Sequence, residues 1–186
     1  MTRILGIGGA TQPGSSTEKA LRIALQGAAD AGGEVRMADG AWLAALPHYG
    51  AGGPCREAEA LVAAVREADG LVIASPAYHG SVSGLVKNAL DHLQETASDP
   101  RPYIDGVAVG LIATAYGGQA GATTMVALRS VVHSLRGWPT PYGACVQGRS
   151  GLFDAEGRCT DAEIEGQLRL VGAQVVEFAR RRADAA

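Results

Sequence analysis

Apolar and polar positions along the chain follow two alternating periods. Short, largely apolar runs predict strands at residues 3–8, 34–38, 71–75, 107–113 and 140–146. Between these runs, and after the last one, apolar residues recur at helical spacing, which predicts helices over about residues 20–28, 56–68, 82–93, 123–135 and 164–178. The glycine-rich segment 40–54 is expected to form a packed surface loop.

This alternation of strands and helices predicts a fold of the α/β class. Helical crossovers make the connected strands parallel, so we expect a five-stranded parallel sheet with helices on both faces. The expected strand order is 2-1-3-4-5, in which a ligand binds where the first and third strands part, beyond their carboxyl ends. A chain of 186 residues suffices for one sizeable core, so we expect a single domain over residues 1–186.

Glycine-rich turns follow the first, third and fourth predicted strands, at residues 9–18, 75–84 and 114–121. Pro76 lacks an N–H group and is expected to end the third strand, while Gly80 and Gly84 let the backbone approach a ligand closely. In the expected strand order, the three turns meet at one edge of the sheet. They therefore predict a single ligand site there.

The first turn has the chemistry of a phosphate site. Ser15, Ser16 and Thr17 stand at the start of a predicted helix, where free N–H groups and the helix dipole favour an anion. Ser15 takes the place of the lysine that a nucleoside-triphosphate loop requires, and the preceding glycines lack the spacing of a dinucleotide fingerprint. A phosphomonoester is the expected ligand, with a purely structural capping box of Ser15 and Glu18 as the alternative.

The second turn carries the most specific pattern in the chain. It begins with Ser75-Pro76-Ala77-Tyr78-His79-Gly80-Ser81 and continues with Gly84, Lys87, Asn88, Ala89 and Asp91. This pattern resembles the S-P-x-Y-x-G-S-x-x-G-x-x-K-N-x-x-D signature of the NAD(P)H-dependent FMN reductases, a family of FMN, quinone, azo and chromate reductases. The resemblance implies a flavodoxin-like three-layer sandwich, FMN as the cofactor, and NADPH or NADH as the reductant.

The resemblance also implies which residues hold the cofactor. In the family, a loop resembling G-S-x-R-x-x-S-x-N/S/T holds the phosphate, the second turn follows the edge of the isoalloxazine ring, and a third turn lies beside its pyrimidine end. Carried over to this sequence, the cofactor-binding residues are Gln12, Ser15, Ser16, Thr17, Pro76, Ala77, Tyr78, His79, Gly80, Thr114, Tyr116, Gly117 and Gly118. At Ala10 and Gln12 the family's hydroxyl and positive charge are missing, so weaker phosphate binding is expected.

The reaction that the resemblance implies depends on the flavin, so no general acid or base is required. His79 and Tyr116 are the candidates for a direct role, the first near the nicotinamide and the second stacked on a ring. A simpler interpretation is that the turn with His79 acts only through its backbone. For Tyr116, the simpler interpretation is a tyrosine at the rim of the site without a catalytic role. The expected cycle is ping-pong: hydride passes from NAD(P)H to FMN, and the reduced flavin is released to a partner or reoxidised by a second substrate.

Three alternatives remain beside this function. The first is a quinone, azo or nitro reductase that keeps its FMN bound, and the second is a flavodoxin-like electron carrier. Such carriers are usually strongly acidic, which a net charge of −3 does not support. The third is a dehydrogenase without flavin.

Composition narrows the partners further. The small net charge gives no reason to expect nucleic acid or a membrane surface as a partner. The histidines and cysteines show no metal-ligand spacing, so no metal site is expected. Unpaired cysteines and the lack of a leader pattern at the N-terminus indicate a cytoplasmic protein.

The expected partners are a small-molecule electron acceptor or a flavin-dependent monooxygenase. By resemblance, the chain is expected to form a homodimer or homotetramer through the helices after the third and fourth strands. The candidates for this interface are Leu85, Leu93, Met125 and Leu128. The candidates for binding the 2′-phosphate of NADPH are Arg101, Arg129 and Arg149, and their spacing does not choose among them.

Overall fold

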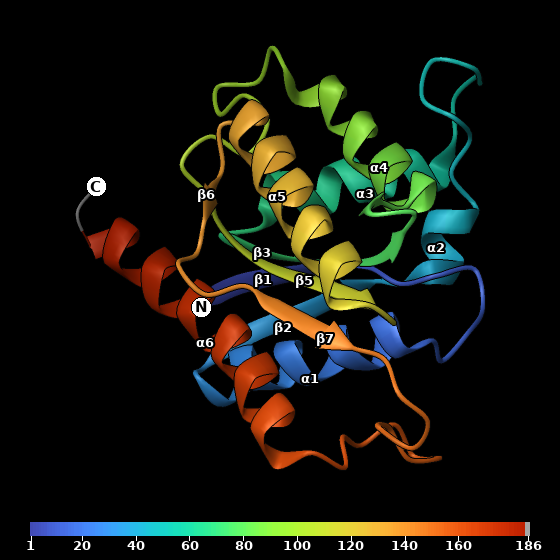
Figure 1. The fold of residues 1–186 in the computed structure, drawn as a ribbon. Coiled ribbons are helices and arrows are strands. Elements are labelled where there is room, and N and C mark those ends of the chain that lie inside the picture. Colours follow the sequence, from blue (N-terminus) through green and yellow to red (C-terminus); the bar gives the residue numbers. More distant parts are fainter. Residues whose placement is uncertain (185–186) are drawn as a thin grey trace.

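The computed structural model describes residues 1–184 and has a central sheet between helices (Figure 1). The strands are β1 (Thr2–Gly8), β2 (Gly33–Ala38), β3 (Gly70–Tyr78), β4 (Ser81–Val82), β5 (Ala108–Ala115), β6 (Trp138–Pro139) and β7 (Ala144–Gln147). The helices are α1 (Ser16–Asp30), α2 (Gly40–Ala44), α3 (Arg56–Glu67), α4 (Gly84–Asp91), α5 (Gly118–Ser134) and α6 (Ala162–Asp184), and a 3₁₀ helix covers His92–Thr96.

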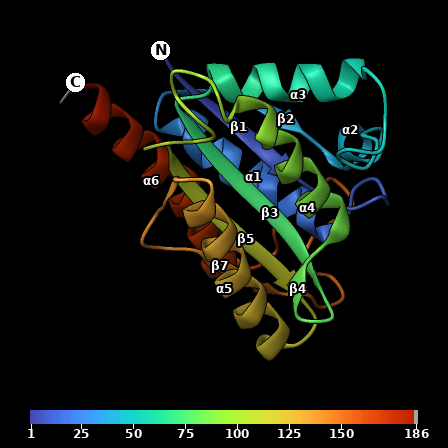
Figure 2. The same ribbon diagram turned by 90° about the horizontal axis from the view of Figure 1, so that it is seen from above.

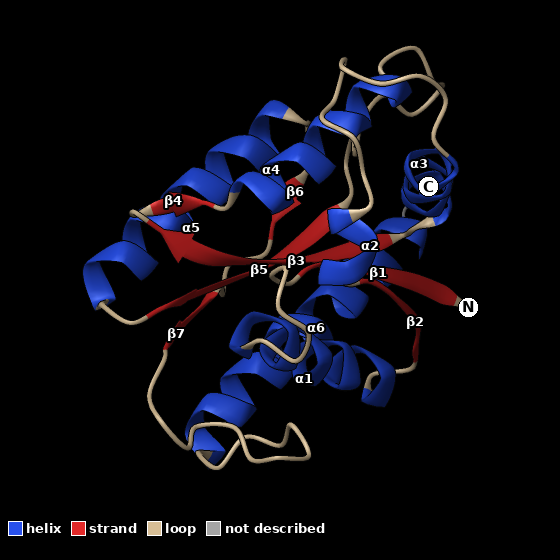
Figure 3. Cartoon of the chain, turned by 90° about the vertical axis from the view of Figure 1, so that its right-hand side faces the viewer, coloured by secondary structure: helices blue, strands red, loops and turns tan. Residues whose placement is uncertain are grey.

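The helices form two layers, one on each face of the sheet (Figure 3). Helices α3, α4 and α5 cover one face, as the view from above shows (Figure 2), and α1 and α6 cover the other. Each layer has its own apolar cluster, one around Leu61, Leu90 and Leu128 and the other around Leu21 and Leu168. Because the central strands are covered on both faces, their apolar runs show no alternation.

The sheet order is β2-β1-β3-β5-β6, with β7 also paired to β5 and the short β4 paired to β3. Apart from the antiparallel β3–β4 hairpin, the strand pairs are parallel. With the hairpin set aside, this is the predicted flavodoxin-like order, so the predicted fold class is confirmed. The order reverses between β1 and β3, which is where such sheets bind their ligands.

The predicted number of five strands is wrong, since the sheet of the described chain has seven. The predicted strand 140–146 is divided into β6 and β7. The N–H of Thr140 still donates to the carbonyl of Val109 at 2.9 Å, but Pro141 has no N–H with which to continue the ladder. The chain pairs with β5 again only at Ala144.

Strand β3 runs through Pro76, contrary to the prediction that this proline ends it. Pro76 pairs with Thr114 of β5, and the next two residues pair with β4. Because β1 ends opposite Ala74, Pro76 has a neighbour from the main sheet on one side only. A missing N–H is tolerated at such a position.

Two helical segments also differ from the prediction. Helix α5 begins at Gly118 rather than Thr123, because its first turns consist of small and polar residues that give no apolar period. The segment 40–54 is not a loop throughout, since it contains α2. Its start is fixed by Asp39, whose carboxylate accepts a hydrogen bond from the N–H of Trp42 at 3.0 Å.

The expected interface side chains on α4, on α5 and in the 3₁₀ helix lie mostly inside the chain. Leu93 and Leu128 are fully buried, Met125 is 9% exposed, and Leu85 packs against the same core. The prediction that Leu93, Met125 and Leu128 remain for an interface is therefore wrong, whereas the prediction for Leu85, which is only half-buried, stays a prediction. Helical spacing identifies an apolar face, but it does not show whether that face covers the chain's own sheet.

Candidate functional site

A cleft of about 450 Å³ lies at the carboxyl ends of β1, β3 and β5. Its volume is within the range of roughly 300–1,000 Å³ that is typical of ligand sites. The loop after β1, the end of β3, the turn after β5 and the residue after β7 contribute to it. The lining residues are Ala10, Thr11, Gln12, Gly14, Ser15, Ser16, Thr17, Pro76, Ala77, Tyr78, Thr114, Ala115, Tyr116 and Gly148.

Most residues predicted for the cofactor lie in this cleft. Those that line it are Gln12, Ser15, Ser16, Thr17, Pro76, Ala77, Tyr78, Thr114 and Tyr116, and those that do not are His79, Gly80, Gly117 and Gly118. Gly148 lines the cleft but is missing from the prediction. The sequence held a signal for Gly148, because this glycine comes two residues after the predicted strand 140–146, at the carboxyl end of β7.

The loop between β1 and α1 is held by its own capping contacts. The N–H of Glu18 donates to the Ser15 hydroxyl at 3.2 Å, and the N–H of Gly14 donates to the Glu18 carboxylate at 3.3 Å. Arg22 donates to the same carboxylate at 2.7 Å. This arrangement corresponds to the structural alternative for Ser15. The exposed Ser16 and Gln12, and the N–H groups of the first helical turn, remain for a ligand.

A buried pair of hydroxyls joins the first and third turns. Thr17 Oγ1 and Thr114 Oγ1 lie 2.5 Å apart, and the two residues are 2% and 7% exposed. One hydroxyl donates to the other, so each has one partner in the chain, and the proton of the accepting hydroxyl remains for a ligand. The pair ties the start of α1 to the end of β5 beneath the cleft.

The turn after β3 is a two-residue hairpin. His79 and Gly80 have φ angles of 53° and 78°, and Tyr78 pairs with Ser81 across the turn. Positive φ at both central residues suits the twist of a hairpin. The Ser75 hydroxyl fixes the return of the chain, because it accepts from the N–H of Ser83 at 3.0 Å. His79 and Gly80, at the tip of this hairpin, are not among the residues that line the cleft.

The turn after β5 presents Tyr116, which is 89% exposed. The side-chain amide of Gln147 donates to the Tyr116 carbonyl at 3.0 Å, and the N–H of Gly148 donates to the Ala115 carbonyl at 2.7 Å. Gly117 is the N-cap of α5 and makes no side-chain cap, so the first N–H groups of that helix remain open. Strand β7 therefore positions the third turn.

The three arginine candidates for the 2′-phosphate differ in position. Arg101 donates to the carbonyls of Ala68, Val65 and Arg66, and burial lowers its pKa. Arg129 donates to the carbonyls of Thr140 and Pro141.

Arg149 directly follows the cleft residue Gly148 and pairs with Asp161 at 2.5 Å. Its guanidinium holds the pKa of Asp161 below the usual value. Of the three arginines, Arg149 alone is adjacent in sequence to a residue that lines the cleft.

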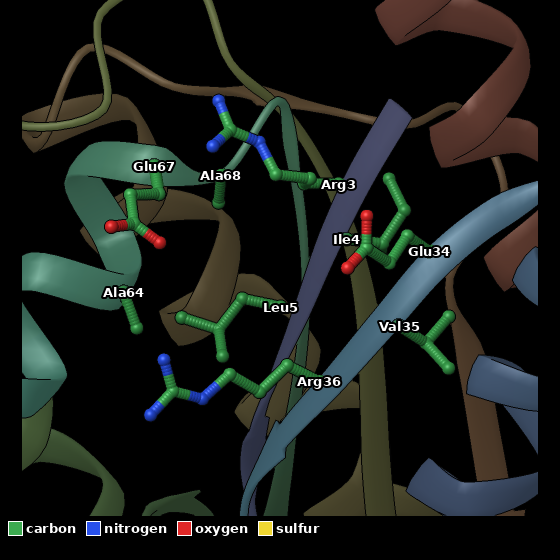
Figure 4. A pocket seen from close by; sticks show the side chains of 9 residues that line it. All are labelled: Arg3, Ile4, Leu5, Glu34, Val35, Arg36, Ala64, Glu67 and Ala68. Carbon is green, nitrogen blue, oxygen red and sulfur yellow. The ribbon is translucent and has the colours of Figure 1, made fainter. Parts of the chain in front are cut away.

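Another cavity, of about 190 Å³, lies between α3 and the edge formed by β1 and β2 (Figure 4). Charges of both signs surround it, from Arg3, Arg36, Glu34 and Glu67. It is far smaller than the cleft and contains none of the glycine-rich turns.

Within residues 1–184, no helix has the length and apolar character needed to cross a membrane. No cluster of potential metal ligands occurs in that range either.

The donors of the cleft suit FMN. One end offers hydroxyls and the open N–H groups of α1, which suit a phosphate. The other end offers the backbone of Pro76 and Ala77 and two exposed tyrosine rings, which suit a flat aromatic system. Among the residues that the structure describes, no charged side chain lines the cleft, so a phosphate would depend on dipoles and hydroxyls.

The strand order of the parallel sheet defines the flavodoxin-like class. The cleft lies where the strand order reverses, and one of its ends suits a phosphate while the other suits an aromatic ring. Within that class, the chain belongs to the NADPH-dependent FMN reductase family, whose model matches residues 2–149. This membership confirms the family predicted from the sequence. The description of the family names FMN and NADPH, as the sequence predicted.

Curated relatives carry a more specific name. The FMN-dependent NADPH-azoreductase of Staphylococcus saprophyticus is 35% identical over 117 residues, which cover 62% of this chain and 58% of that protein. The enzyme of the same name from Staphylococcus aureus strain USA300 is 34% identical over 113 residues, or 60% of this chain and 56% of that protein. The match thus spans little more than half the length of these relatives.

Solved structures share the fold over nearly the whole chain. FerB, a flavoenzyme NAD(P)H:(acceptor) oxidoreductase from Paracoccus denitrificans, has a TM-score of 0.79 at 19% identity, covering 97% of this chain and 98% of that one. An oxidoreductase from Corynebacterium diphtheriae has a TM-score of 0.78 at 19% identity and the same coverage. At such identities the likeness shows the fold alone.

Proposed function

We propose that the chain is an NAD(P)H-dependent FMN reductase, with one FMN-binding domain over residues 1–186. The observation that supports this best is the convergence of the loop after β1, the end of β3 and the turn after β5 on a single cleft with two chemically different ends. FMN, when bound, supplies the redox chemistry by taking hydride from the nicotinamide C4 at its N5 atom.

The chain's own residues bind and orient the cofactor. Ser16, Gln12 and the N–H groups at the start of α1 hold the phosphate, because a helix N-terminus favours an anion. When FMN is bound, the backbone from Pro76 to Tyr78, which lines the cleft, would border its ring system. The open N–H groups after Gly117 lie next to the cleft residue Tyr116 but outside the cleft lining, and the positive end of the α5 dipole would stabilise negative charge on the pyrimidine end from there.

We expect NADPH and the electron acceptor to use the same cleft one after the other, which makes the cycle ping-pong. We expect parallel lines in double-reciprocal plots when NADPH is varied at several fixed acceptor concentrations. Intersecting lines would show that both substrates occupy the site together and would contradict the cycle.

A second candidate is a reductase that keeps its FMN bound and reduces an azo, quinone or nitro compound. The names of the Staphylococcus relatives favour it. The missing positive charge in the phosphate loop favours the flavin-releasing form instead. The affinity for FMN separates the two candidates.

The direct test is an FMN titration of the flavin-stripped chain, followed by flavin fluorescence, together with NADPH oxidation with and without FMN. Saturable binding and FMN-dependent NADPH oxidation are expected. Binding without NADPH oxidation would favour an electron carrier. NADPH oxidation without flavin would favour a dehydrogenase, and no FMN binding would overturn the proposal.

Restoring the family's positive charge is expected to tighten FMN binding. Gln12 is exposed on the phosphate loop, so Gln12→Arg can reach a phosphate without rearranging the core. An exposed ion pair contributes about 1 kcal/mol, which corresponds to roughly a fivefold lower Kd for FMN. The measurement is the same fluorescence titration.

Riboflavin and a second arginine variant provide the controls for this prediction. Riboflavin lacks the phosphate, so its Kd is expected to be unchanged by Gln12→Arg. Gln26→Arg adds the same charge to an exposed position farther along α1 and should leave FMN binding unaltered. Equal tightening of riboflavin, or an equal effect of Gln26→Arg, would refute a direct phosphate contact.

We further propose a homodimer or homotetramer in the cytoplasm that delivers electrons to a small-molecule acceptor or a flavin-dependent monooxygenase. The three cysteines are unpaired in the structure, which favours a reducing compartment. Light scattering at micromolar concentration tests the assembly, and a monomer would contradict it.

A further inference from the structure

A cavity of about 490 Å³ lies between the edge strand β6 and the last turns of α6, and we call it the edge cavity. Trp138 of β6 and Phe178 of α6 line it, and they are 71% and 38% exposed. Ala108, the first residue of β5, lines the edge cavity, whereas Thr114, near the end of β5, lines the cleft. Six residues of strand place the two sites about 20 Å apart, so the proposed function does not use the edge cavity.

The backbone of this edge has no N–H group with which to bind another strand. The N–H groups of Trp138 and Thr140 donate inward, at 2.8 and 2.9 Å, to carbonyls of β5 and of the residue before it. Pro139 and Pro141 have no N–H at all. An extended peptide, or the edge strand of a second copy, needs backbone donors on the strand that it extends. The occupant of the edge cavity must therefore be held by side chains.

The guanidinium of Arg182, which also lines the edge cavity, is held in place by the backbone. Its Nη1 donates to the carbonyl of Asp105 at 3.2 Å. It lies against Gly106, where a Cβ would be 2.6–2.8 Å from three guanidinium atoms. Among residues 1–184, no carboxylate forms an ion pair with Arg182, whereas the neighbouring Arg181 pairs with Glu177. Arg182 thus keeps N–H donors in a fixed position, and their planar fork suits a carboxylate.

We propose that the edge cavity is a second ligand site, which binds a planar aromatic carboxylate. The aromatic ring of the ligand stacks on Trp138 and Phe178, and its carboxylate accepts hydrogen bonds from Arg182. No acidic side chain of the described residues lines the cavity, so no neighbouring charge repels an anion. Because the cleft lies at the other end of β5, this ligand and FMN bind at the same time.

The test is a calorimetric titration of the full chain with 2-naphthoate and with the uncharged 2-acetylnaphthalene, both with and without saturating FMN. The variants are Arg182→Gln, Trp138→Leu and Arg180→Gln. Arg180 is the matched control, because it is exposed on the same helix turn, donates to the carbonyl of Gly32 and does not line the edge cavity. Since Arg182 and Trp138 are exposed, the urea midpoints of their variants should equal that of the wild type.

Arg182→Gln is expected to raise the Kd for 2-naphthoate about fivefold, as the loss of an exposed ion pair implies, and to leave the Kd for 2-acetylnaphthalene unchanged. Trp138→Leu should raise both Kd values about fivefold through the loss of stacking. Arg180→Gln and saturating FMN should change neither value.

Three results would overturn the inference. The first is no binding of 2-naphthoate at millimolar concentration, or binding that neither Arg182→Gln nor Trp138→Leu weakens. The second is a Kd for 2-naphthoate that rises with FMN, which would place the probe in the cleft. The third is a change from dimer to monomer in light scattering of Trp138→Leu, which would assign the edge cavity to a second copy of the chain.

Discussion

Replacing Gly172 by alanine is expected to lower the free energy of unfolding by about 3 kcal/mol. Gly172 lies where α6 crosses α1, and a Cβ there would be 1.8 Å from the carbonyl oxygen of Ala24 and 2.8 Å from the nitrogen of Ala28. Both are backbone atoms, so no side chain can turn away and the helices must separate. The urea midpoint followed by far-UV circular dichroism measures the loss.

Gly166→Ala on the same helix is the matched control. Gly166 is exposed and a Cβ there would meet nothing within 4 Å. Alanine is the better helix former, so this variant should gain about 0.5–1 kcal/mol. Opposite signs for two glycines of one helix would identify the helix crossing as the cause. An unchanged midpoint for Gly172→Ala would mean that the helices do not meet there.

The apolar periods of α1 and α6 predicted which face of each helix is buried. Leu21 and Leu25 on α1, and Leu168 and Val175 on α6, belong to one cluster, as their spacing indicates. The close crossing was not predictable, because Gly27 and Gly172 contribute nothing to an apolar period. A periodic pattern identifies a buried face, whereas the partner and the distance depend on residues elsewhere in the chain.

The candidate site, like the helix crossing, could be predicted from the sequence only in part. Strand order alone placed the three turns together, since the carboxyl ends of neighbouring parallel strands meet at one edge. The role of a single hydroxyl within a turn could not be predicted in this way. Ser15, Ser16 and Thr17 look equivalent in the sequence, yet Ser15 caps α1 and Thr17 bonds to a residue 97 positions away. Hydrogen-bond partners across such separations depend on the folded topology.

The Thr17–Thr114 pair leads to the second large expected effect. Thr17→Val should lower the free energy of unfolding by about 1–3 kcal/mol, because it leaves the buried Thr114 hydroxyl without a partner. The double variant Thr17→Val, Thr114→Val replaces both hydroxyls by groups of the same shape. It should therefore be more stable than either single variant, and a double-mutant cycle in urea measures the coupling.

Thr124→Val is the control for this cycle, because the Thr124 hydroxyl is fully buried and has no partner among the described residues. Its removal should leave the stability unchanged or raise it. Additive losses for Thr17→Val and Thr114→Val would show that the two hydroxyls do not bond to each other. FMN titration of the double variant then separates the two roles of Thr17: wild-type affinity assigns it to joining the turns, and loss of affinity to holding the phosphate.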